Sequence, residues 1–201
     1  MQDVSLKAAL SKPITHQIGG HLALDFCNTA GEHLADHPDE MFLDWETFIR
    51  WTAQVGLIAP ETYSELFRHP SPISKILQLR EAIYRVGLTI ARGDRISPSH
   101  LLTIHSQAAA SKPTIVNGRH GLRWQPVPSR ASAQLRALLA SEALSLFCSP
   151  RSSRIGICEG GQCGWLFLDD SRGKRRRWCD MKDCGNRAKA RRYYLQQHPG
   201  K

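Results

Sequence analysis

The sequence contains no hydrophobic run that approaches the ~20 residues of a membrane-spanning helix. The segment Met1-Gln2-Asp3-Val4 lacks the basic region and apolar stretch that open a secretory signal. Walker A, Gly-x-Gly-x2-Gly, Gly-x-Ser-x-Gly and His-Glu-x2-His motifs are also missing. These absences favour a cytoplasmic protein without membrane contact, and we do not expect an enzyme.

What the chain does contain is typical of a folded globular protein. It has 201 residues, of which 41% are hydrophobic and 22% are charged. That length allows one domain of medium size and a small additional module. The sequence has no internal repeat and no low-complexity tract.

Positive charge is concentrated near the C-terminus. Residues 151–201 hold thirteen Lys and Arg against five Asp and Glu, whereas residues 1–150 hold fourteen against thirteen. The net charge of +9 therefore lies almost entirely in the last quarter of the chain. Such asymmetry is typical of a polyanion-binding module attached to a neutral body, although a solvated basic tail has the same composition.

Four cysteines lie within this basic segment, and their spacing predicts a metal site. Cys158 and Cys163 form one Cys-x4-Cys pair, Cys179 and Cys184 form another, and fifteen residues separate the pairs. Two such pairs supply the four thiolates of a tetrahedral structural Zn²⁺ site, and in a reducing compartment they favour metal binding over disulfides. An iron–sulfur cluster is the main alternative. Release of zinc on oxidation is a minor further hypothesis, because neighbouring arginines stabilise thiolates.

Residues 1–150 are predicted to be mainly helical. Asp44 is expected to cap one helix. Ser71-Pro72 and Ser97-Pro98 are expected to begin two more, which end near Gly93 and Ala110. Between the last helices of the body, Asn117-Gly118 lies between apolar residues and predicts a β-hairpin over Thr114 to Trp124.

Helical spacing also predicts which apolar residues are buried. A helix from Arg130 to Phe147 is expected to bury its leucines at 135, 138, 139 and 146. The helix that begins at Ser97-Pro98 is expected to bury five residues: Leu101, Leu102, Ile104, His105 and Ala108.

Residues 149–153 break the helical pattern and are expected to form a linker. Beyond it, strands are predicted at 154–157 and 164–169, followed by a turn and a return segment at 175–178. Residues 186–194, rich in Ala, Lys and Arg, predict a final helix. A knuckle, a hairpin and a second ligand pair at a helix start resemble a treble-clef zinc finger. Trp165, Phe167 and Trp178 are expected to cover the metal site as a small core.

One tetrapeptide makes the resemblance specific. Cys184-Gly185-Asn186-Arg187 is the signature of CGNR zinc-finger proteins, and the chain also matches that family at Cys158, Cys163 to Asp169, Arg177 to Cys179 and Ala188 to Tyr193. Gly20 to Thr29 resembles the ABATE domain, which usually precedes this finger. The resemblance implies an ABATE-like helical domain at 1–150, a CGNR-type finger at 151–201, and a stress-linked transcription regulator.

The cations of the finger are interpreted as a surface that contacts phosphates, with the final helix entering the major groove of duplex DNA. They are Arg172, Lys174, Arg175, Arg176, Arg177, Arg187, Lys189, Arg191 and Arg192. A merely solubilising face is the plainer interpretation. RNA is an alternative partner, in which Trp165 or Trp178 stacks on unpaired bases.

The body has one set of polar residues that invites a functional interpretation. His21, Asp25 and Asn28 share a face if their segment is helical, and they would line a pocket for a small-molecule signal. Hydrogen bonds that anchor loops inside the fold are the interpretation we favour. The body is expected to sense a signal or to form a homodimer. A metabolite-binding or enzymatic body with a purely structural finger is the alternative.

Overall fold

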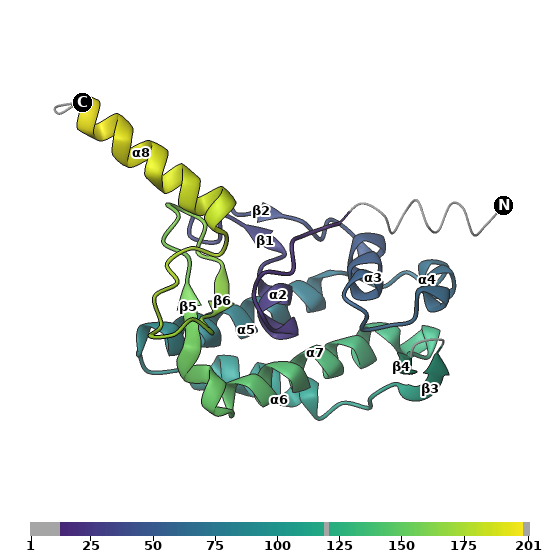
Figure 1. The fold of residues 1–201 in the computed structure, drawn as a ribbon. Coiled ribbons are helices and arrows are strands. Elements are labelled where there is room, and N and C mark those ends of the chain that lie inside the picture. The colour runs from purple at the N-terminus through teal and green to yellow at the C-terminus, as the bar shows by residue number, and fades with distance from the viewer. Residues whose placement is uncertain (1–12, 119–120, 199–201) are drawn as a thin grey trace.

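The computed structural model describes residues 13–118 and 121–198, and helices dominate it (Figure 1). The α-helices are α2 Leu22–Cys27, α3 Trp45–Gln54, α4 Pro60–Phe67, α5 Ser74–Arg92, α6 Pro98–Ala108, α7 Ala131–Phe147 and α8 Asn186–Gln197. The strands pair as antiparallel hairpins: β1 Ala30–Gly31 with β2 Asp39–Glu40, β3 Thr114–Gly118 with β4 Gly121–Gln125, and β5 Ile155–Ile157 with β6 Leu166–Leu168. The predicted mainly α fold with a small hairpin is confirmed.

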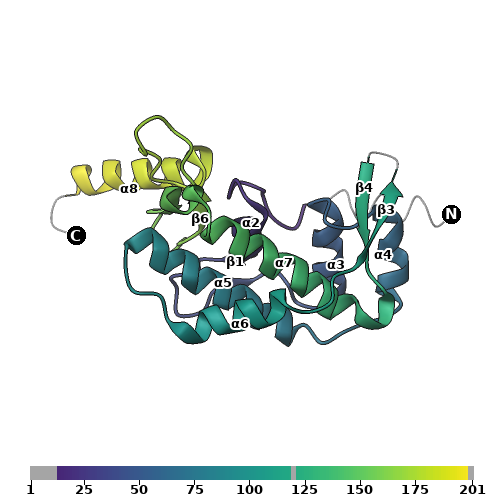
Figure 2. The ribbon, with the colours of Figure 1, turned by 90° about the horizontal axis from the view of Figure 1, so that it is seen from below.

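The long helices form the base of the molecule. Helix α5 packs against α6 and α7, and the short helix α2 lies on α5 and α7. Helices α3 and α4 and the β3–β4 hairpin form one end of the molecule, and α8 projects from the other (Figures 1 and 2). Among the described residues, no helix combines the length and the apolar character needed to cross a lipid bilayer.

Local sequence signals set the ends of several helices. Asp44 caps α3 through a reciprocal capping box, in which its Oδ1 accepts a hydrogen bond of 2.8 Å from the Thr47 amide. Gly93 ends α5 in the left-handed conformation, with φ of +75°, which few other residues adopt without strain. Helix α5 begins at Ser74, three residues after the predicted start at Ser71.

The burial of α7 follows the prediction, whereas that of α6 does not. Leu135, Leu138, Leu139 and Leu146 are all buried in the core. On α6, however, Leu101 and Leu102 are 38% and 68% exposed, and His105 is exposed as well. Helix α6 packs on α5 and α7 from outside and buries Ile104 alone, so the prediction of a broad buried face is wrong.

The predicted β3–β4 hairpin is present, but its turn lies elsewhere. Asn117 pairs with Leu122 and Gly118 pairs with Gly121, so both residues of the predicted turn belong to β3. The connection consists of residues 119–120, which lie outside the described residues.

The finger strands share the hydrophobic core of the helical body. Ile155, Leu166 and Leu168 belong to the same buried cluster as the apolar residues of α2, α5 and α7. The contact with α5 is close, because a Cβ at Gly87 would lie 2.7 Å from Leu166 Cδ1. The metal module therefore rests directly on the body.

The segment after the body departs from the sequence prediction in two details. The expected linker forms a 3₁₀ helix, η2 Pro150–Arg154, capped by Ser149. Strand β6 pairs with β5 across the first knuckle, and residues 175–178 form no strand beside it. A one-turn π-helix, η3 Met181–Gly185, then leads directly into α8.

Candidate metal centre and nucleic-acid interface

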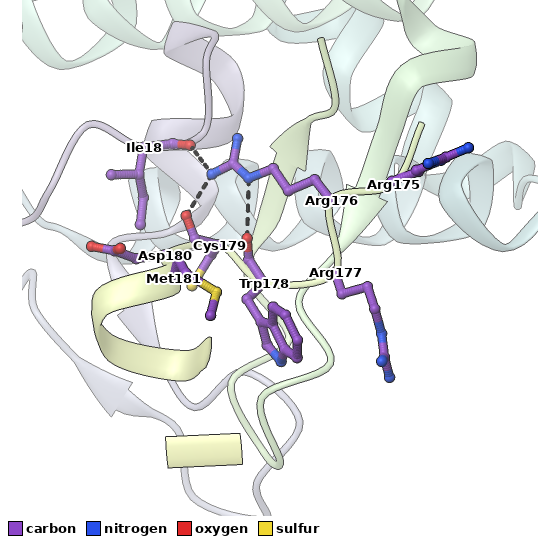
Figure 3. A pocket seen from close by; sticks show the side chains of 8 residues that line it. All are labelled: Ile18, Arg175, Arg176, Arg177, Trp178, Cys179, Asp180 and Met181. Atoms are coloured by element: carbon purple, nitrogen blue, oxygen red, sulfur yellow. Dashed lines mark hydrogen bonds between the residues drawn. The ribbon is translucent and has the colours of Figure 1, made fainter. Parts of the chain in front are cut away.

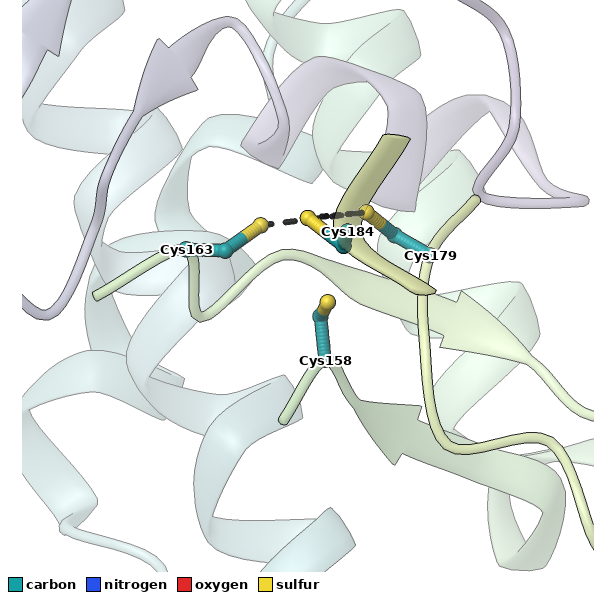
Figure 4. Close-up of side chains that lie close together, drawn as sticks. All are labelled: Cys158, Cys163, Cys179 and Cys184. Atoms are coloured by element: carbon teal, nitrogen blue, oxygen red, sulfur yellow. Dashed lines mark hydrogen bonds between the residues drawn. The ribbon is translucent and has the colours of Figure 1, made fainter. Parts of the chain in front are cut away.

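The four cysteines of the two pairs meet at one point (Figure 4). Cys158 and Cys163 lie between β5 and β6, Cys179 precedes η3, and Cys184 lies within it. All four Sγ atoms lie within 4.8 Å of one another, and none of the residues is more than 6% exposed. All four are free thiols. The structure thus brings together every predicted metal ligand.

The spacing of the sulfurs tests which metal centre they fit. Cys179 Sγ lies 3.7 Å from the sulfurs of Cys163 and Cys184. Tetrahedral Zn²⁺ with Zn–S bonds of ~2.3 Å places its ligands ~3.8 Å apart. A cluster of several irons needs thiolates spread around several metal atoms, and sulfurs this close do not provide that span. The residues fit a single tetrahedral ion.

The crowding of four thiols also favours a positive charge between them. Hydrogen bonds with Cys163 and Cys179 lower the pKa of Cys158. Hydrogen bonds with Cys158 and Cys163, together with burial, raise the pKa of Cys179. Without a metal, the four sulfurs therefore favour ionisation of Cys158 and oppose ionisation of Cys179. A divalent ion removes this conflict, because thiols that coordinate a metal are deprotonated.

The backbone of each ligand pair is shaped to hold the sulfurs inward. Cys158 N donates to Trp165 O at 2.8 Å and closes the first knuckle. A Cβ at Gly160 would lie 2.8 Å from Cys184 Sγ, so only glycine leaves the space that the sulfurs occupy. In the second pair, Asp180 Oδ1 accepts from Lys182 N at 2.8 Å and starts the π-turn that carries Cys184.

The helical body supports the first knuckle through the segment around β1. His33 N donates to Cys163 O at 2.9 Å, and Trp165 Nε1 donates to Ala30 O at 2.7 Å. The His33 ring is buried and stacks on Tyr84 with ring centroids 3.6 Å apart. Tyr84 in turn donates its hydroxyl proton to Gly164 O at 3.1 Å. The first ligand pair is therefore held by the body as well as by its own loop.

Asn28 forms the most direct link between body and finger. Its side chain donates to Leu166 O and accepts from Leu166 N, each at 2.9 Å, although the residues are 138 positions apart. Asn28 is fully buried. The amide thus takes the place of a neighbouring strand beside β6.

The other two residues of the predicted pocket also bond to backbone. His21 Nδ1 accepts from Ala23 N at 3.2 Å and caps α2. Asp25 Oδ1 accepts from Gly19 N at 2.8 Å, and burial outweighs this bond and raises the pKa of Asp25 to about 6. With Asn28, all three side chains serve as anchors inside the fold, which is the interpretation that we favoured.

Arg176 has to be removed from the predicted phosphate-contacting set. Its guanidinium donates to the carbonyl oxygens of Ile18, Leu168, Trp178 and Cys179 and lies 4.3 Å from the centroid of the Phe167 ring. These bonds join the second ligand pair to β6 and to the segment before α2. The side chain is a structural brace, because four of its five N–H donors bond to backbone carbonyls inside the finger and at its junction with the body.

Three further cations of the set already have partners. Arg177 forms two hydrogen bonds with Glu159 Oε2, at 2.5 and 2.7 Å. Lys174 Nζ donates to Ser153 O at 3.0 Å. Arg187 Nη2 lies 3.1 Å from Cys184 Sγ, and Arg187 Nε lies 3.2 Å from Asp183 Oδ1. The guanidinium therefore contributes positive charge to the metal site. These side chains are exposed and retain charge, but their positions are partly fixed by the finger.

The remaining five cations form what we call the free cation set, defined as Arg172, Arg175, Lys189, Arg191 and Arg192. Each is exposed, and within the described residues none has a side-chain hydrogen bond or ion pair. Two lie on the loop before Cys179 and three lie on α8. They provide unpaired positive charge on the finger.

Helix α8 is the most exposed helix segment of the finger. It buries none of its residues and projects away from the body (Figure 1). Even its apolar residues face solvent: Tyr193, Tyr194 and Leu195 are 66%, 53% and 49% exposed. An isolated helix of twelve residues is marginal in water, so α8 depends on its attachment at η3 and the metal site.

Sequence reasoning named Asn28 as an anchor but missed its partner in the finger, and it missed the connecting roles of His33 and Arg176 altogether. The bonds of Asn28, His33 and Arg176 join segments that are far apart in the chain. Arg176 lies between Arg175 and Arg177, so the local sequence does not distinguish this partly buried brace from its exposed neighbours. An uncharged amide next to a strongly apolar helix, as at Asn28, is the one local signal of a buried hydrogen-bonding role.

Comparison with known families agrees with this architecture. Residues 154–197 match the family model described as CGNR zinc finger. Residues 20–150 match the model named ABATE, described as "putative stress-induced transcription regulator". No curated protein matches the chain. Because the second match spans well over half of the sequence, the chain belongs to the ABATE family and carries a CGNR zinc finger at its C-terminal end.

Proposed function

We propose that the protein is a zinc-dependent, DNA-binding transcription regulator, in which the finger contacts duplex DNA. The observation that carries this proposal is the free cation set, which has no hydrogen bond or ion pair among the described residues and has three of its members on the projecting helix α8 (Figure 1). Unpaired Lys and Arg are the groups that neutralise phosphates and release counterions from DNA. The family description supports a role in regulation.

The distribution of charge on α8 suits insertion between two phosphate backbones. At 100° per residue, Arg191 and Lys189 lie on different sides of the helix, and Arg192 lies between the two. A helix in the major groove has a phosphate backbone on each side, so cations around its circumference can contact both strands. A helix that packs on a protein surface would instead collect its charges on one side.

Zinc is the ion that we propose for the four-cysteine site. The sulfurs have the spacing of a tetrahedral Zn²⁺ site, and all four donors are thiolates, which this ion accepts. Bound zinc would fix η3 and therefore the direction of α8. DNA binding should then require the metal, although the ion itself contacts no phosphate.

The body is proposed to receive a signal or to form a homodimer. Hydrogen bonds from the β1 segment to the first knuckle provide a direct mechanical connection between body and finger. A single finger of this size also offers limited surface, because specific protein–DNA interfaces bury about 1,000–2,500 Å² of protein. Two copies on adjacent half-sites would supply that area.

The test is the salt dependence of binding to a labelled duplex of mixed sequence. The wild-type protein should bind at about 50 mM salt and weaken steeply toward about 200 mM. Replacing Lys189, Arg191 and Arg192 together with Ala should lower the slope of log K against log salt by about 2.7, if each contacts one phosphate. Undetectable binding of the wild-type protein at the lower salt would refute the proposal.

The matched control removes the same charge from the opposite end of the molecule. Arg68 follows α4, Lys112 precedes β3, and Arg130 precedes α7, and all three are exposed. Replacing these three with Ala changes the net charge equally. If this control lowers the slope as much as the α8 variant does, the binding surface is not on the finger.

A further inference from the structure

The finger contains a surface hollow, and Arg175 is the member of the free cation set that lines it (Figure 3). It has a volume of about 560 Å³, within the range of sites for small organic groups. It is lined by Ile18, Arg175, Arg176, Arg177, Trp178, Cys179, Asp180 and Met181. All but Ile18 belong to the segment that leads into the second ligand pair.

The hollow combines an apolar surface with cations at its edge. The apolar part consists of Ile18, Trp178 and Met181. Ile18 and Trp178 are partly buried, and Met181 is exposed. The side chains of Trp178, Arg177 and Met181 point to the same side, whereas Arg176 turns back toward Ile18 and Cys179 (Figure 3). An indole beside an open volume is a surface on which a flat ring can stack.

The polar groups of the hollow differ in their availability. Arg175 is exposed and its guanidinium has no hydrogen bond or ion pair among the described residues. Arg177 is paired with Glu159, and its guanidinium lies 5.2 Å from the centroid of the Trp178 ring. Asp180 uses Oδ1 in the π-turn, which leaves Oδ2 to accept a hydrogen bond from a ligand. Arg175 is therefore the cation most available to an anionic group.

We propose that this hollow binds one unpaired nucleotide of a DNA strand held by the finger. The base would stack on Trp178 next to Met181, the adjacent phosphate would lie against Arg175, and Asp180 would accept from a base amino group. This inference rests on the proposed function. It adds a preference for DNA with an unpaired base beside a duplex, such as a bulge or a distorted site.

The neighbouring surface favours a nucleotide within a strand over a free small molecule. Arg172 lies on the same loop as Arg175, and α8 with its cations begins directly after η3. A strand whose base enters the hollow would therefore meet further cations along its backbone. A free mononucleotide would leave these cations unused.

The experiment compares affinities of the zinc-loaded full-length protein for four probes at one salt concentration. The probes are a continuous duplex, the same duplex with a single-nucleotide bulge, the same bulge without its base, and single-stranded RNA. The wild-type protein should bind the bulged duplex about 5-fold or more tightly than the continuous or the abasic one, as stacking of one base provides. Free mononucleotide is added as a competitor.

Variants separate stacking from charge. Trp178→Ala should abolish the preference for the bulge, and Trp178→Phe should retain part of it. Arg175→Ala should reduce binding of the bulged duplex more than that of the continuous one, whereas Arg172→Ala, with the same loss of charge on the same loop, should weaken both equally. Metal content per chain, measured for each variant, shows that the finger is intact.

Several results would overturn the inference. Equal affinity for the continuous, bulged and abasic duplexes would do so, as would an unchanged preference in Trp178→Ala. Single-stranded RNA that outcompetes the bulged duplex would assign the hollow to RNA, and displacement of the bulged duplex by free mononucleotide would assign it to a small molecule. Failure of the proposed function would look different, because no DNA probe would then bind even at low salt.

Discussion

The two halves of the metal site each provide two thiolates, but they are supported in different ways. Cys158 and Cys163 lie between β5 and β6, whose apolar side chains belong to the core of the body and whose backbone is bound by Asn28. Cys179 and Cys184 lead into α8, which buries no side chain. One half is held by the body, whereas the guanidinium of Arg176 is the main brace of the other among the described residues, so a bound metal would supply much of its support.

This difference assigns separate tasks to the halves. The supported half fixes the position of the finger on the body, because breaking it would expose core residues such as Leu166 and Leu168. The second half displays cations, because a helix that buries none of its residues leaves most of its circumference open to a partner. A metal bound between the halves would transmit the rigidity of the first to the second.

The largest effect is expected when a ligand of the exposed half is removed. Cys184→Ser should release the metal, since three thiolates hold Zn²⁺ far more weakly than four, and binding free energies of such sites reach about 10–16 kcal/mol. Helix α8 should then lose its helical structure while most of the body remains folded. Metal analysis and far-ultraviolet circular dichroism measure both effects.

Cys148→Ser is the matched control for that variant, because Cys148 is an exposed free thiol outside the metal site. It should retain one metal ion per chain and the wild-type spectrum. If Cys184→Ser instead retains the metal, or loses the structure of the whole body, the proposed division of support between the halves is wrong.

The metal ligands and several helix ends could be predicted from the sequence, since they depend on local spacing. The two Cys-x4-Cys pairs, the cap at Asp44, the stop at Gly93 and the cationic helix after Cys184 are all signals within a few residues of the element they set. The structure places each of them as expected, and the four sulfurs meet.

The support of the first half could not be predicted, because it depends on distant partners. Asn28 and Leu166 are 138 residues apart, and Arg176 reaches Ile18 across 158 residues. The prediction that the leucines of α6 are buried was wrong for a related reason. Leu102 has the spacing of a core residue, but whether a helix face is covered depends on what else packs there.

A smaller effect should separate two identical substitutions in the two halves. Leu166→Ala removes a fully buried side chain from the shared core and should reduce the free energy of unfolding by about 2–5 kcal/mol. Leu195→Ala removes a side chain that is 49% exposed on α8 and should change it by less than about 0.5 kcal/mol. Urea unfolding of the zinc-loaded protein measures both. Comparable losses in the two variants would show that α8 packs on the body.

The smallest effect concerns a carboxyl group that holds the supported half in place. Asp25 binds the Gly19 amide, and Gly19 O accepts from Leu168 N at 2.8 Å. Burial raises the pKa of Asp25 to about 6, above its ordinary value of 3.8, so ionisation opposes folding. This cost is fully present above pH 6, shrinks as the pH falls, and is lost only below 3.8, where the carboxyl is protonated in the folded and unfolded chain alike. Asp25→Asn keeps an oxygen for Gly19 and has no charge to bury.

The substitution Asp25→Asn should therefore stabilise the protein by about 1–2 kcal/mol at pH 7.5, and the difference should shrink as the pH falls and vanish below pH 3.8. Urea unfolding of both at each pH gives the difference, in which the pH dependence of metal binding cancels because it is common to both. A constant difference across this range would mean that the Asp25 carboxyl is solvated. A loss of stability at pH 7.5 would instead show that the anchor needs a charged acceptor, since charged hydrogen bonds are stronger than neutral ones.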